Sequence, residues 1–496
     1  MYKNDAGRPG AVLAAVATAQ FTVALDMSVV NVALPSVRAA LGFAPVDLAW
    51  VVHAYALAFG GFLLLGGRAG DLFGRRRLFA WGLAVFGLAS LAGGLAQAPW
   101  QLVAARAVQG LAAAALAPAG LAMLATTFTE GRARVRALGV WSGVNAVGGA
   151  TGVLAGGLLT EYAGWRWVML VNVPIIAGAL ALTASGVPAG PRAERRDRLD
   201  VPGALLATAG TGLLVYGVVR TDRHGWTSGT TLGTLALAAV LLAAFVCTEA
   251  VLARSRTAAP LLRPGLLRSR WVAGANVFVF LAAAGQFAAF YFVSLYMQQV
   301  LGMSAAATGA AFLPFSAGAV AGTLAGTRIA GLRTPRAALV PGALLAAAGM
   351  AWFAFISPSG SFLADVLGPS LVASVGVGMC LGPVAVAATM GVAAHEAGTA
   401  SGVLNSARQL GGAVGLAALV TLAAARTGTR TGAAALNDGY AAALLVTGAL
   451  FLAAALVAFF VLPSRAAEDT ASPAPAHSGG GASVSPSGTS GSTERR

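Results

Sequence analysis

The sequence predicts an all-α integral membrane protein with fourteen transmembrane helices and both termini in the cytoplasm. The chain has 496 residues, of which 57% are hydrophobic and only 10% are charged, whereas about 25% charge is usual in a soluble domain. Apolar runs long enough to cross the roughly 30 Å hydrocarbon core of a bilayer recur along it. The basic residues gather in alternate connections, as they do in cytoplasmic loops. These three observations carry the fold prediction.

The apolar runs are separated by charges, prolines or glycine clusters. They are rich in Leu and Ala, and they lack the alternation of polar and apolar residues that marks membrane β-strands. We therefore expect these segments to be helices, because a helix satisfies all the backbone hydrogen bonds of a single segment in lipid. We expect the spans at residues 11–34, 47–67, 78–97, 101–124, 137–160, 168–187, 202–220, 231–252, 272–299, 305–329, 337–357, 362–386, 399–424 and 440–462.

The basic residues assign a side to each connection. Most of the 32 lysines and arginines fall in every second connection and in the termini, which places these parts in the cytoplasm. An even number of helices follows. The formal net charge of +15 then indicates attraction to anionic lipid of the inner leaflet. A nucleic-acid partner would require the basic residues on one soluble face, and they are spread over many connections instead.

A repeated pattern divides the chain into two halves. PAGLAMLATTFTEG (118–131) and the following SGVNAVGGATG (142–152) are similar to PVAVAATMGVAAHEAG (383–398) and the following SGVLNSARQLGGAVG (401–415). The offset of eight helices predicts six, two and six helices, and repeats of this kind build secondary transporters. The expected parts are a cytoplasmic N-terminus (1–10), a six-helix bundle (11–187), a cytoplasmic connector with two inserted helices and a basic loop (188–270), a second six-helix bundle (271–463) and a disordered cytoplasmic tail (464–496).

The connection after the second run, GGRAGDLFGRRR (66–77), places one acid among four arginines. Glycine allows a sharp turn there. The acid can accept hydrogen bonds from helix N-termini and from arginines, so we expect this short link to latch against other helices and to release from them. The candidate residues of this gating link are Gly67, Gly70, Asp71, Gly74, Arg75 and Arg76.

Asp26 is an acid deep inside the first predicted span. It lies about 22 Å along the helix from Ala11 at 1.5 Å per residue, and an acid inside a span is a functional hypothesis by default. Burial favours the protonated carboxyl and a nearby cation favours the carboxylate, so a proton that leaves when substrate arrives would couple the two movements. The alternative is that Asp26 only joins neighbouring helices by hydrogen bonds.

Short motifs follow one another on the expected helices. They are LDMSVVNVALP (25–35), the link GGRAGDLFGRRR (66–77), LVAARAVQG (102–110), GGATGVLAGG (148–157) and WRWVMLVNVP (165–174). In this order they resemble the fourteen-helix drug:proton antiporter branch of the major facilitator superfamily, and the resemblance covers roughly residues 11 to 463. Leu72 stands where the link motif usually has a basic residue, and Val153 stands where the helix 5 motif has proline.

The resemblance implies the major facilitator fold and a multidrug or antibiotic exporter of a bacterial plasma (inner) membrane, driven by the proton gradient. It implies a part for Arg106 in proton coupling beside Asp26, although Arg106 could equally hold its helix in place as one member of a buried ion pair. It also implies that the glycines of the helix 5 motif form a packed hinge that favours export. These glycines are Gly148, Gly152, Gly156 and Gly157.

Partners and cofactors follow from the same reading. We expect amphipathic small molecules as substrates, lipid as the surroundings, protons as the coupling ion, no cofactor, no metal and a monomer as the functional unit. Isolated polar residues in the spans are candidates for lining the substrate cavity, although such residues more often bond to a neighbouring helix. These candidates are His53, Gln109, Asn145 and Gln286.

Other classes of function are tested by the residues they would need. The only lysine is Lys3, so the chain has no phosphate-binding loop of an ATP-driven pump. The four histidines and two cysteines are scattered, which argues against a membrane-embedded enzyme. An importer or facilitator of a metabolite on the same fold remains open, as does a membrane sensor that transports nothing, because fold does not determine function.

Overall fold

The computed structural model describes residues 9–44, 47–128, 131–187, 201–220, 225, 227–252, 265, 268–392 and 397–463. The connector at 188–200 and the predicted disordered tail at 464–496 lie outside the described residues. Within the described residues all regular secondary structure is helical. This agrees with the predicted all-α membrane architecture.

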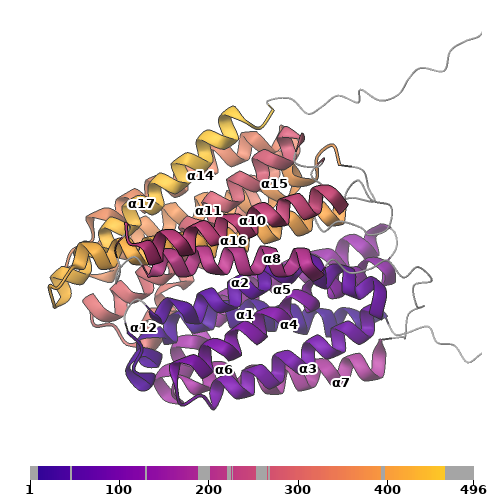
Figure 1. Cartoon of the computed structure of the whole chain (residues 1–496), viewed down its shortest axis with the longest axis horizontal. Coiled ribbons are helices and arrows are strands. Elements are labelled where there is room, and N and C mark those ends of the chain that lie inside the picture. Colours follow the sequence, from indigo (N-terminus) through magenta and orange to yellow (C-terminus); the bar gives the residue numbers. More distant parts are fainter. Residues whose placement is uncertain are drawn as a thin grey trace, which may run out of the picture. The chain divides into compact units, whose positions relative to one another are not determined.

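Each predicted apolar run lies on a helical stretch (Figure 1). Among the described residues, twelve stretches are long and apolar enough to cross a membrane, and two shorter apolar helices lie at Asp47–Leu63 and Leu205–Val218. The first part of the chain forms α1 (Pro9–Leu41), η1 (Asp47–Ala49), α2 (Trp50–Phe73), α3 (Arg75–Gly94), α4 (Pro99–Thr127), α5 (Gly131–Tyr162), α6 (Arg166–Leu170) and α7 (Asn172–Gly186). The remainder forms α8 (Val201–Val219), α10 (Gly229–Leu252), α11 (Arg270–Leu295), η3 (Tyr296–Val300), α12 (Ala305–Ala311), α13 (Leu313–Leu332), α14 (Pro335–Trp352), η4 (Phe353–Phe355), η5 (Phe362–Leu367), α15 (Gly368–Thr389), α16 (Ala397–Thr427) and α17 (Ala433–Phe460).

Two helices run further than their apolar sequence. Helix α1 continues past Pro35 to Leu41, because a proline late in a helix removes only one hydrogen bond and the last residues of α1 still pack on apolar neighbours. Helix α2 continues to Phe73, so a single residue, Gly74, separates it from α3. The expected short link is therefore mostly helix, and Gly74 makes the reversal with φ of 91°.

The helices fall into two sets by their contacts. In the first, which we call the N-terminal group (α1 to α7), α2 packs on α4, α1 on α5 and α7, and α3 on α4 and α7. In the second, the C-terminal group (α11 to α17), α15 packs on α13 and α14, and α11 packs on α16 and α17. The two groups meet where α2 contacts α16, where α5 contacts α12, and where α1 contacts α11.

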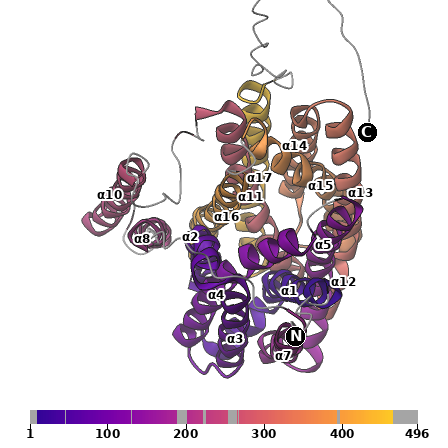
Figure 2. The same cartoon turned by 90° about the vertical axis from the view of Figure 1, so that its right-hand side faces the viewer.

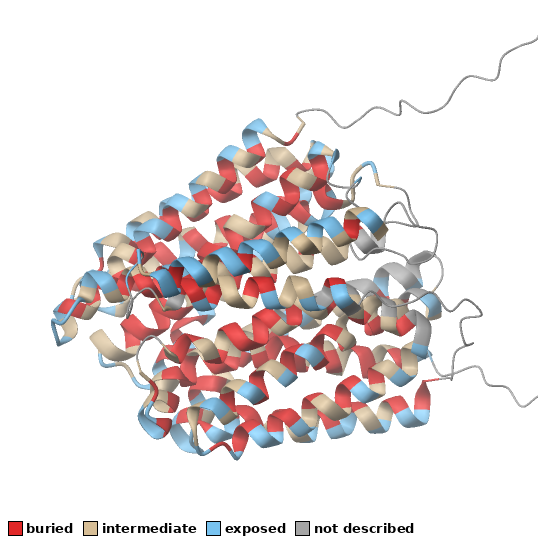
Figure 3. Ribbon diagram, in the orientation of Figure 1, coloured by how far each residue is buried: buried red, intermediate tan, exposed pale blue. Residues whose placement is uncertain are grey.

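Helices α8 and α10 form a pair beside both groups. Helix α8 packs on α10 and also on α2 and α16, so it covers the line where the two groups meet (Figure 2). Helix α10 is the outer member of the pair, and most of its residues are exposed or half-buried (Figure 3). Its exposed residues are largely apolar, as expected for a helix surrounded by lipid.

Three hydrogen bonds between the two groups lie near one end of α1, α5 and α11. The Ser294 hydroxyl donates to the Asn31 carbonyl at 3.3 Å, and the Gln298 amide donates to the Val32 carbonyl at 3.0 Å. The backbone N–H of Ala306 donates to the Glu161 carboxylate at 2.7 Å. By the predicted topology this end faces outward. The two groups therefore touch one another on that side in this conformation.

Candidate functional site

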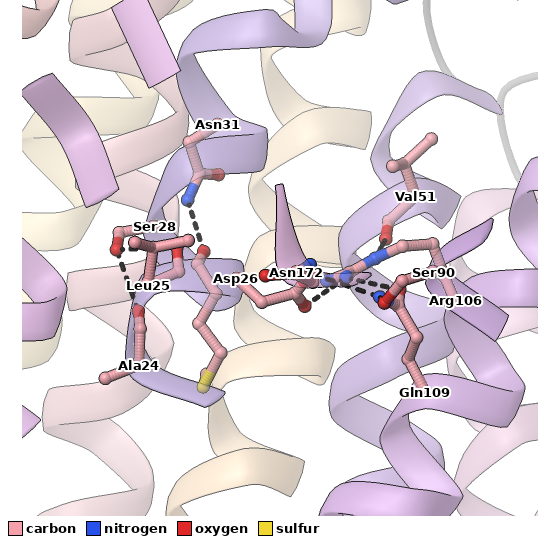
Figure 4. Close-up of polar contacts among 11 residues, drawn as sticks. Ala24, Leu25, Asp26, Ser28, Asn31, Val51, Ser90, Arg106, Gln109 and Asn172 are labelled. Carbon is pink, nitrogen blue, oxygen red and sulfur yellow. Dashed lines mark hydrogen bonds and ion pairs between the residues drawn. The ribbon is translucent and has the colours of Figure 1, made fainter. Parts of the chain in front are cut away.

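Asp26 lies at the centre of a buried polar network in the N-terminal group (Figure 4). Its side chain is fully buried. One carboxylate oxygen, Oδ2, accepts a hydrogen bond from Arg106 of α4 and forms an ion pair with it. The other oxygen, Oδ1, accepts from the Gln109 amide at 3.1 Å and from the Asn172 amide at 2.7 Å. Asp26 therefore ties α1 to α4 and to the start of α7.

Arg106 is held on several sides. Its Nη1 donates to Asp26 and to the Gln109 side-chain oxygen, and its Nε donates to the Val51 carbonyl of α2 at 3.0 Å. The guanidinium carbon also lies 4.4 Å from the centre of the Tyr55 ring, a cation–π contact. The planar fork of arginine suits this set of partners, since a lysine ammonium could not reach both the carbonyl and the carboxylate in the same geometry.

Gln109 completes the network and extends it to α3. Its amide donates to Asp26 and to the Ser90 hydroxyl at 2.8 Å, while its oxygen accepts from Arg106. The residue is fully buried in this conformation. Gln109 is thus a member of the polar network, and its role as a substrate-lining residue stays a prediction.

The motif around Arg106 places these side chains by a close approach of two helices. A Cβ added at Gly110 would overlap the Tyr55 carbonyl oxygen of α2. Only glycine lets α4 and α2 approach so closely. Because Gly110 follows Gln109, this contact sets the depth at which Arg106 and Gln109 meet Asp26. The motif thus combines a glycine that allows close helix packing with two polar side chains that bond to Asp26.

The contacts of Asp26 in this conformation are those of an ionised carboxylate. An ionised carboxylate is acceptor-only, and here it receives three N–H donors. A protonated carboxyl would have to donate its own hydrogen, so it would lose at least one of these bonds and would leave the buried Arg106 cation without its counter-charge. The charge of Asp26 therefore helps to hold α1 against α4 and α7 in this conformation.

The glycines of the helix 5 motif lie against α1, directly behind Asp26. A Cβ at Gly148 would lie 2.9 Å from the Phe21 carbonyl oxygen, and a Cβ at Gly152 or Gly156 would lie 2.6 Å from the carbonyl oxygens of Leu25 and Val29, respectively. Each step of four on α5 thus matches a step of four on α1. Gly157 faces the other way, where a Cβ would overlap the Ala305 carbonyl oxygen of α12. Helix α5 is uninterrupted at Val153, the position where the motif has proline.

Arginines of the predicted gating link bond to the ends of two other helices. Arg76 donates to the Ala184 carbonyl in the last turn of α7 at 3.0 Å, and Arg75 approaches the Ala122 carbonyl of α4 at 3.5 Å. Cations are stabilised near the C-terminal ends of helices. A Cβ at Gly67 would meet only ordinary contacts, as would one at Gly70. The side chain of Asp71 lies outside the described residues, so its expected latch contacts stay a prediction.

The remaining candidates lie apart from the Asp26 network. Asn145 is exposed and accepts from the Gln20 amide of α1 at 2.7 Å. Gln286 lies in the wall of an apolar pocket of the C-terminal group, beside Phe290, which stacks on Phe312 with ring centres 5.3 Å apart. His53 is fully buried in α2, the helix that packs on α4, α8 and α16. Their role as substrate-lining residues stays a prediction.

Arg408 is a further cation inside a helix of the C-terminal group. Within the described part of the chain it forms no hydrogen bond or ion pair, and it is half-buried. It lies one turn before Gly411 and Gly412, which pack against Phe280 and Phe287 of α11. Its side of α16 therefore faces α11.

Sequence reasoning missed three members of the Asp26 network. Ser90, Asn172 and Tyr55 each lie in a helix where a small polar or aromatic residue is unremarkable. Asn172 was within reach, because it belongs to the quoted motif WRWVMLVNVP (165–174). The break between α6 and α7 at Val171 puts Asn172 at the first position of α7, from where its amide reaches Asp26.

Known proteins similar to this chain are membrane transporters. A family model described as the Major Facilitator Superfamily matches residues 16–416. The cephamycin export protein CmcT of Amycolatopsis lactamdurans is 46% identical over 455 residues, which are 90% of this chain and 91% of that protein. A puromycin resistance protein of Streptomyces alboniger is 42% identical over 474 residues, 93% of each chain.

A solved structure supports the fold independently. The crystal structure of a bacterial homolog to the human lysosomal transporter Spinster, in an inward-facing and occupied conformation, gives a TM-score of 0.62 over 91% of this chain and 96% of that chain. The sequence identity is 18%. At this identity the likeness concerns the arrangement of helices alone.

Proposed function

The chain belongs to the major facilitator superfamily, and from that premise we propose that it exports antibiotic-like amphipathic molecules in exchange for protons, with Asp26 as the proton-binding group. It is a multi-pass membrane transporter of the drug-exporter type, since relatives above 40% identity across nine-tenths of the chain are an antibiotic export protein and an antibiotic resistance protein. The proton as driving ion is our proposal.

The observation that carries the proposal is the set of three donors on the buried Asp26 carboxylate. This arrangement suits the ionised acid, and protonation must disrupt it. A group whose charge state changes the contacts of three helices, α1, α4 and α7, is a means of coupling proton movement to a change of shape.

Helix α1 connects this group to the contact between the two halves. Asn31 and Val32 lie about 8 to 9 Å further along α1 than Asp26 at 1.5 Å per residue, and their carbonyls accept from Ser294 and Gln298 of α11 and η3. A shift of α1 on protonation of Asp26 would therefore weaken the outward-side contact. We propose that proton binding favours the outward-open state in this way.

The topology completes the proposal. We place fourteen spans in a bacterial plasma membrane with both termini in the cytoplasm, counting α2 and α8 with the twelve longer stretches. Hydrophobic or cationic amphipathic molecules enter from the cytoplasmic side or from lipid. We propose a monomer without cofactor and without enzymatic activity.

The test is transport in everted membrane vesicles. A proton gradient is imposed, a panel of dyes and antibiotics that includes cephamycin and puromycin is added, and accumulation is followed with and without an uncoupler. Accumulation that the uncoupler abolishes supports the proposal. Accumulation that persists without any ion gradient contradicts proton exchange, and accumulation only in right-side-out vesicles favours an importer. Absence of any movement across the panel favours a sensor.

A further inference from the structure

His53 carries two unsatisfied polar atoms at the contact between the halves. Its side chain is fully buried in α2, and neither ring nitrogen has a hydrogen-bond partner among the described residues. Buried polar groups without partners are rare and costly. The neighbouring Trp50 makes a ring contact with His53 at nearly a right angle, with the two ring centres 5.7 Å apart, and this contact is not a hydrogen bond to either ring nitrogen. This imidazole therefore has no structural bond that explains its presence.

The surface that covers His53 belongs to the other half of the molecule. Gly60 lies two turns further along α2 on the same face, and there the Ser406 hydroxyl donates to its carbonyl at 3.0 Å while Gln409 packs against it. Helices α2 and α16 are antiparallel in the predicted topology, so His53 meets α16 about 10 Å beyond that contact, near Ala413 and Leu416. Both of these residues are buried and apolar.

Helix α8 closes the remaining side. Ala56 and Leu57, one turn after His53, share a hydrophobic cluster with Val215 and Val218 of α8 and with Ala413 of α16. The Thr421 hydroxyl of α16 donates to the Val218 carbonyl at 3.3 Å and joins the same elements. We call this contact of α2, α8 and α16 the outer seam.

The charged and titratable groups of these elements do not bond to His53. Arg220 lies over the Tyr216 ring of α8 at 5.1 Å, and Arg106 bonds to the Val51 carbonyl on the opposite side of α2. An imidazolium buried here would have no acceptor for either N–H, so the closed seam holds the neutral ring. The groups on the packed elements are Asp47 of η1, Tyr55 of α2, Arg106 of α4, Tyr216 and Arg220 of α8, and Arg408 of α16.

We propose that His53 is a second proton-binding group, which is neutral and buried while the outer seam is closed and takes up a proton from the outer solution when the seam opens. His53 is the fourth residue of α2 and lies close to the predicted outer end of the helix. Opening of the outer seam therefore exposes the ring to water directly. A protonated ring resists reburial, and acid on the outer side then holds the seam open. Histidine suits this task because it changes charge near neutral pH.

This inference rests on the proposed alternating-access exporter, but its test does not require transport. The two native cysteines are replaced, and spin labels are attached at Leu95→Cys and Arg426→Cys, exposed positions at the predicted outer ends of the two groups. The distance distribution is measured in lipid nanodiscs without substrate from pH 8.5 to 5.5. Each variant is measured both with Asp26 and with Asp26→Asn, so that any titration of Asp26 is separated from that of His53.

The expected result is an open-to-closed ratio that rises on acidification, by up to about tenfold per pH unit for one proton. His53→Phe and His53→Gln should both abolish this rise, the first by removing the nitrogens and the second by keeping a polar group that does not titrate. Gln409→Leu is the matched control, since Gln409 is also buried without amide partners at the same contact but has no charge to gain. It should leave the pH slope unchanged.

Three outcomes overturn the proposal. The first is no acid-dependent opening in the His53 protein, the second is an unchanged slope in His53→Gln, and the third is loss of the slope in Gln409→Leu. If the vesicle experiment shows no proton-driven export while the His53-dependent opening is present, the proposed function fails and the proton-binding seam stands.

Discussion

Asp26 and Arg106 form a buried ion pair, and hydrogen bonds from neighbouring residues hold both side chains in place. Removing one member of a buried pair leaves an uncompensated charge, which in soluble proteins costs about 3–5 kcal/mol. Here the remaining partner, Arg106, keeps only the Val51 carbonyl and Gln109 as neutral acceptors. The pair is thus sensitive to any change of charge at Asp26, and a bound proton is the smallest such change.

Asp26→Asn should abolish uphill efflux while leaving the protein folded. Asparagine has nearly the same shape and can accept from Asn172 or Gln109, but it carries neither charge nor a titrating proton. We expect proton-driven accumulation in everted vesicles to fall at least about tenfold. Downhill movement of the same dye, which needs no proton, should persist and serves as the control for folding. Undiminished uphill efflux would refute the assignment.

Arg106→Lys tests whether geometry matters beyond charge. Lysine retains the positive charge, but it loses the Nε contact with the Val51 carbonyl. A hydrogen bond to a charged group contributes about 1.5–3 kcal/mol, so we expect transport at roughly a tenth of the original rate, measured in the same vesicles. Full activity of the lysine variant would show that Arg106 supplies only charge.

The candidate site was predictable from sequence only where residue type is decisive. Asp26 and Arg106 stand out because ionised residues are rare inside apolar spans. Ser90 and Tyr55 could not be recognised, because such residues are common in helices and their direction depends on how α2 and α3 cross α4. The buried state of His53 likewise depends on α8 and α16, which lie far from it in the sequence.

At the scale of the element, α5 packs closely along α1. The glycines at 148, 152 and 156 bring the two backbones together along the stretch of α1 that contains Asp26. Gly157, one residue later, places the same helix against α12 of the other group. Helix α5 therefore touches both the helix that contains Asp26 and the opposite half, and it does so without the proline of the motif.

Gly152→Ala should impair both stability and transport. The added methyl group would meet the Leu25 carbonyl at 2.6 Å and would also overlap the Ser28 hydroxyl. Overpacking of this kind costs about 1–3 kcal/mol, so thermal unfolding should shift to lower temperature and efflux should slow. Gly149→Ala is the matched control in the same motif, because a Cβ there has no atom within 4 Å. Equal effects of the two substitutions would contradict the packing role.

Element boundaries were harder to predict than the elements themselves. The hydropathy of the sequence indicates where a helix leaves the lipid. It does not indicate how far the helix continues into water. This is why α1 continues beyond Pro35 and α2 beyond its apolar run. The positive φ of Gly74, in contrast, was within reach of sequence reasoning, because glycine before a basic pair is a strong signal for a reversal.

At the scale of the molecule, the all-helical membrane fold followed from composition and run length, since lipid permits few alternatives. The way in which the N-terminal and C-terminal groups contact each other could not be predicted from the sequence. It depends on contacts such as that of Glu161 with Ala306, which involve ordinary residues at helix ends. The placement of α8 over the contact of α2 with α16 was equally beyond the sequence. These contacts decide which conformation the described helices adopt.

A reversible cross-link between the groups should stop transport. Glu161 bonds to the N–H of Ala306 at 2.7 Å, at the start of α12 beside Ser304. Glu161→Cys with Ser304→Cys, joined by a short thiol cross-linker in a background without the two native cysteines, would hold α5 against α12. If the outward side must open in each cycle, efflux should fall to less than about a tenth, because the outward-open state becomes inaccessible.

The control cross-link lies within one group. Tyr162→Cys with Arg166→Cys joins the end of α5 to α6, both in the N-terminal group, and should leave efflux largely intact. Cleavage of the cross-linker should restore efflux in the Glu161 and Ser304 variant. Continued efflux by the fully cross-linked protein would mean that α5 and α12 stay together throughout the cycle. The opening that releases substrate would then have to occur at the other contacts of the two groups, those of α1 with α11 and of α2 with α16.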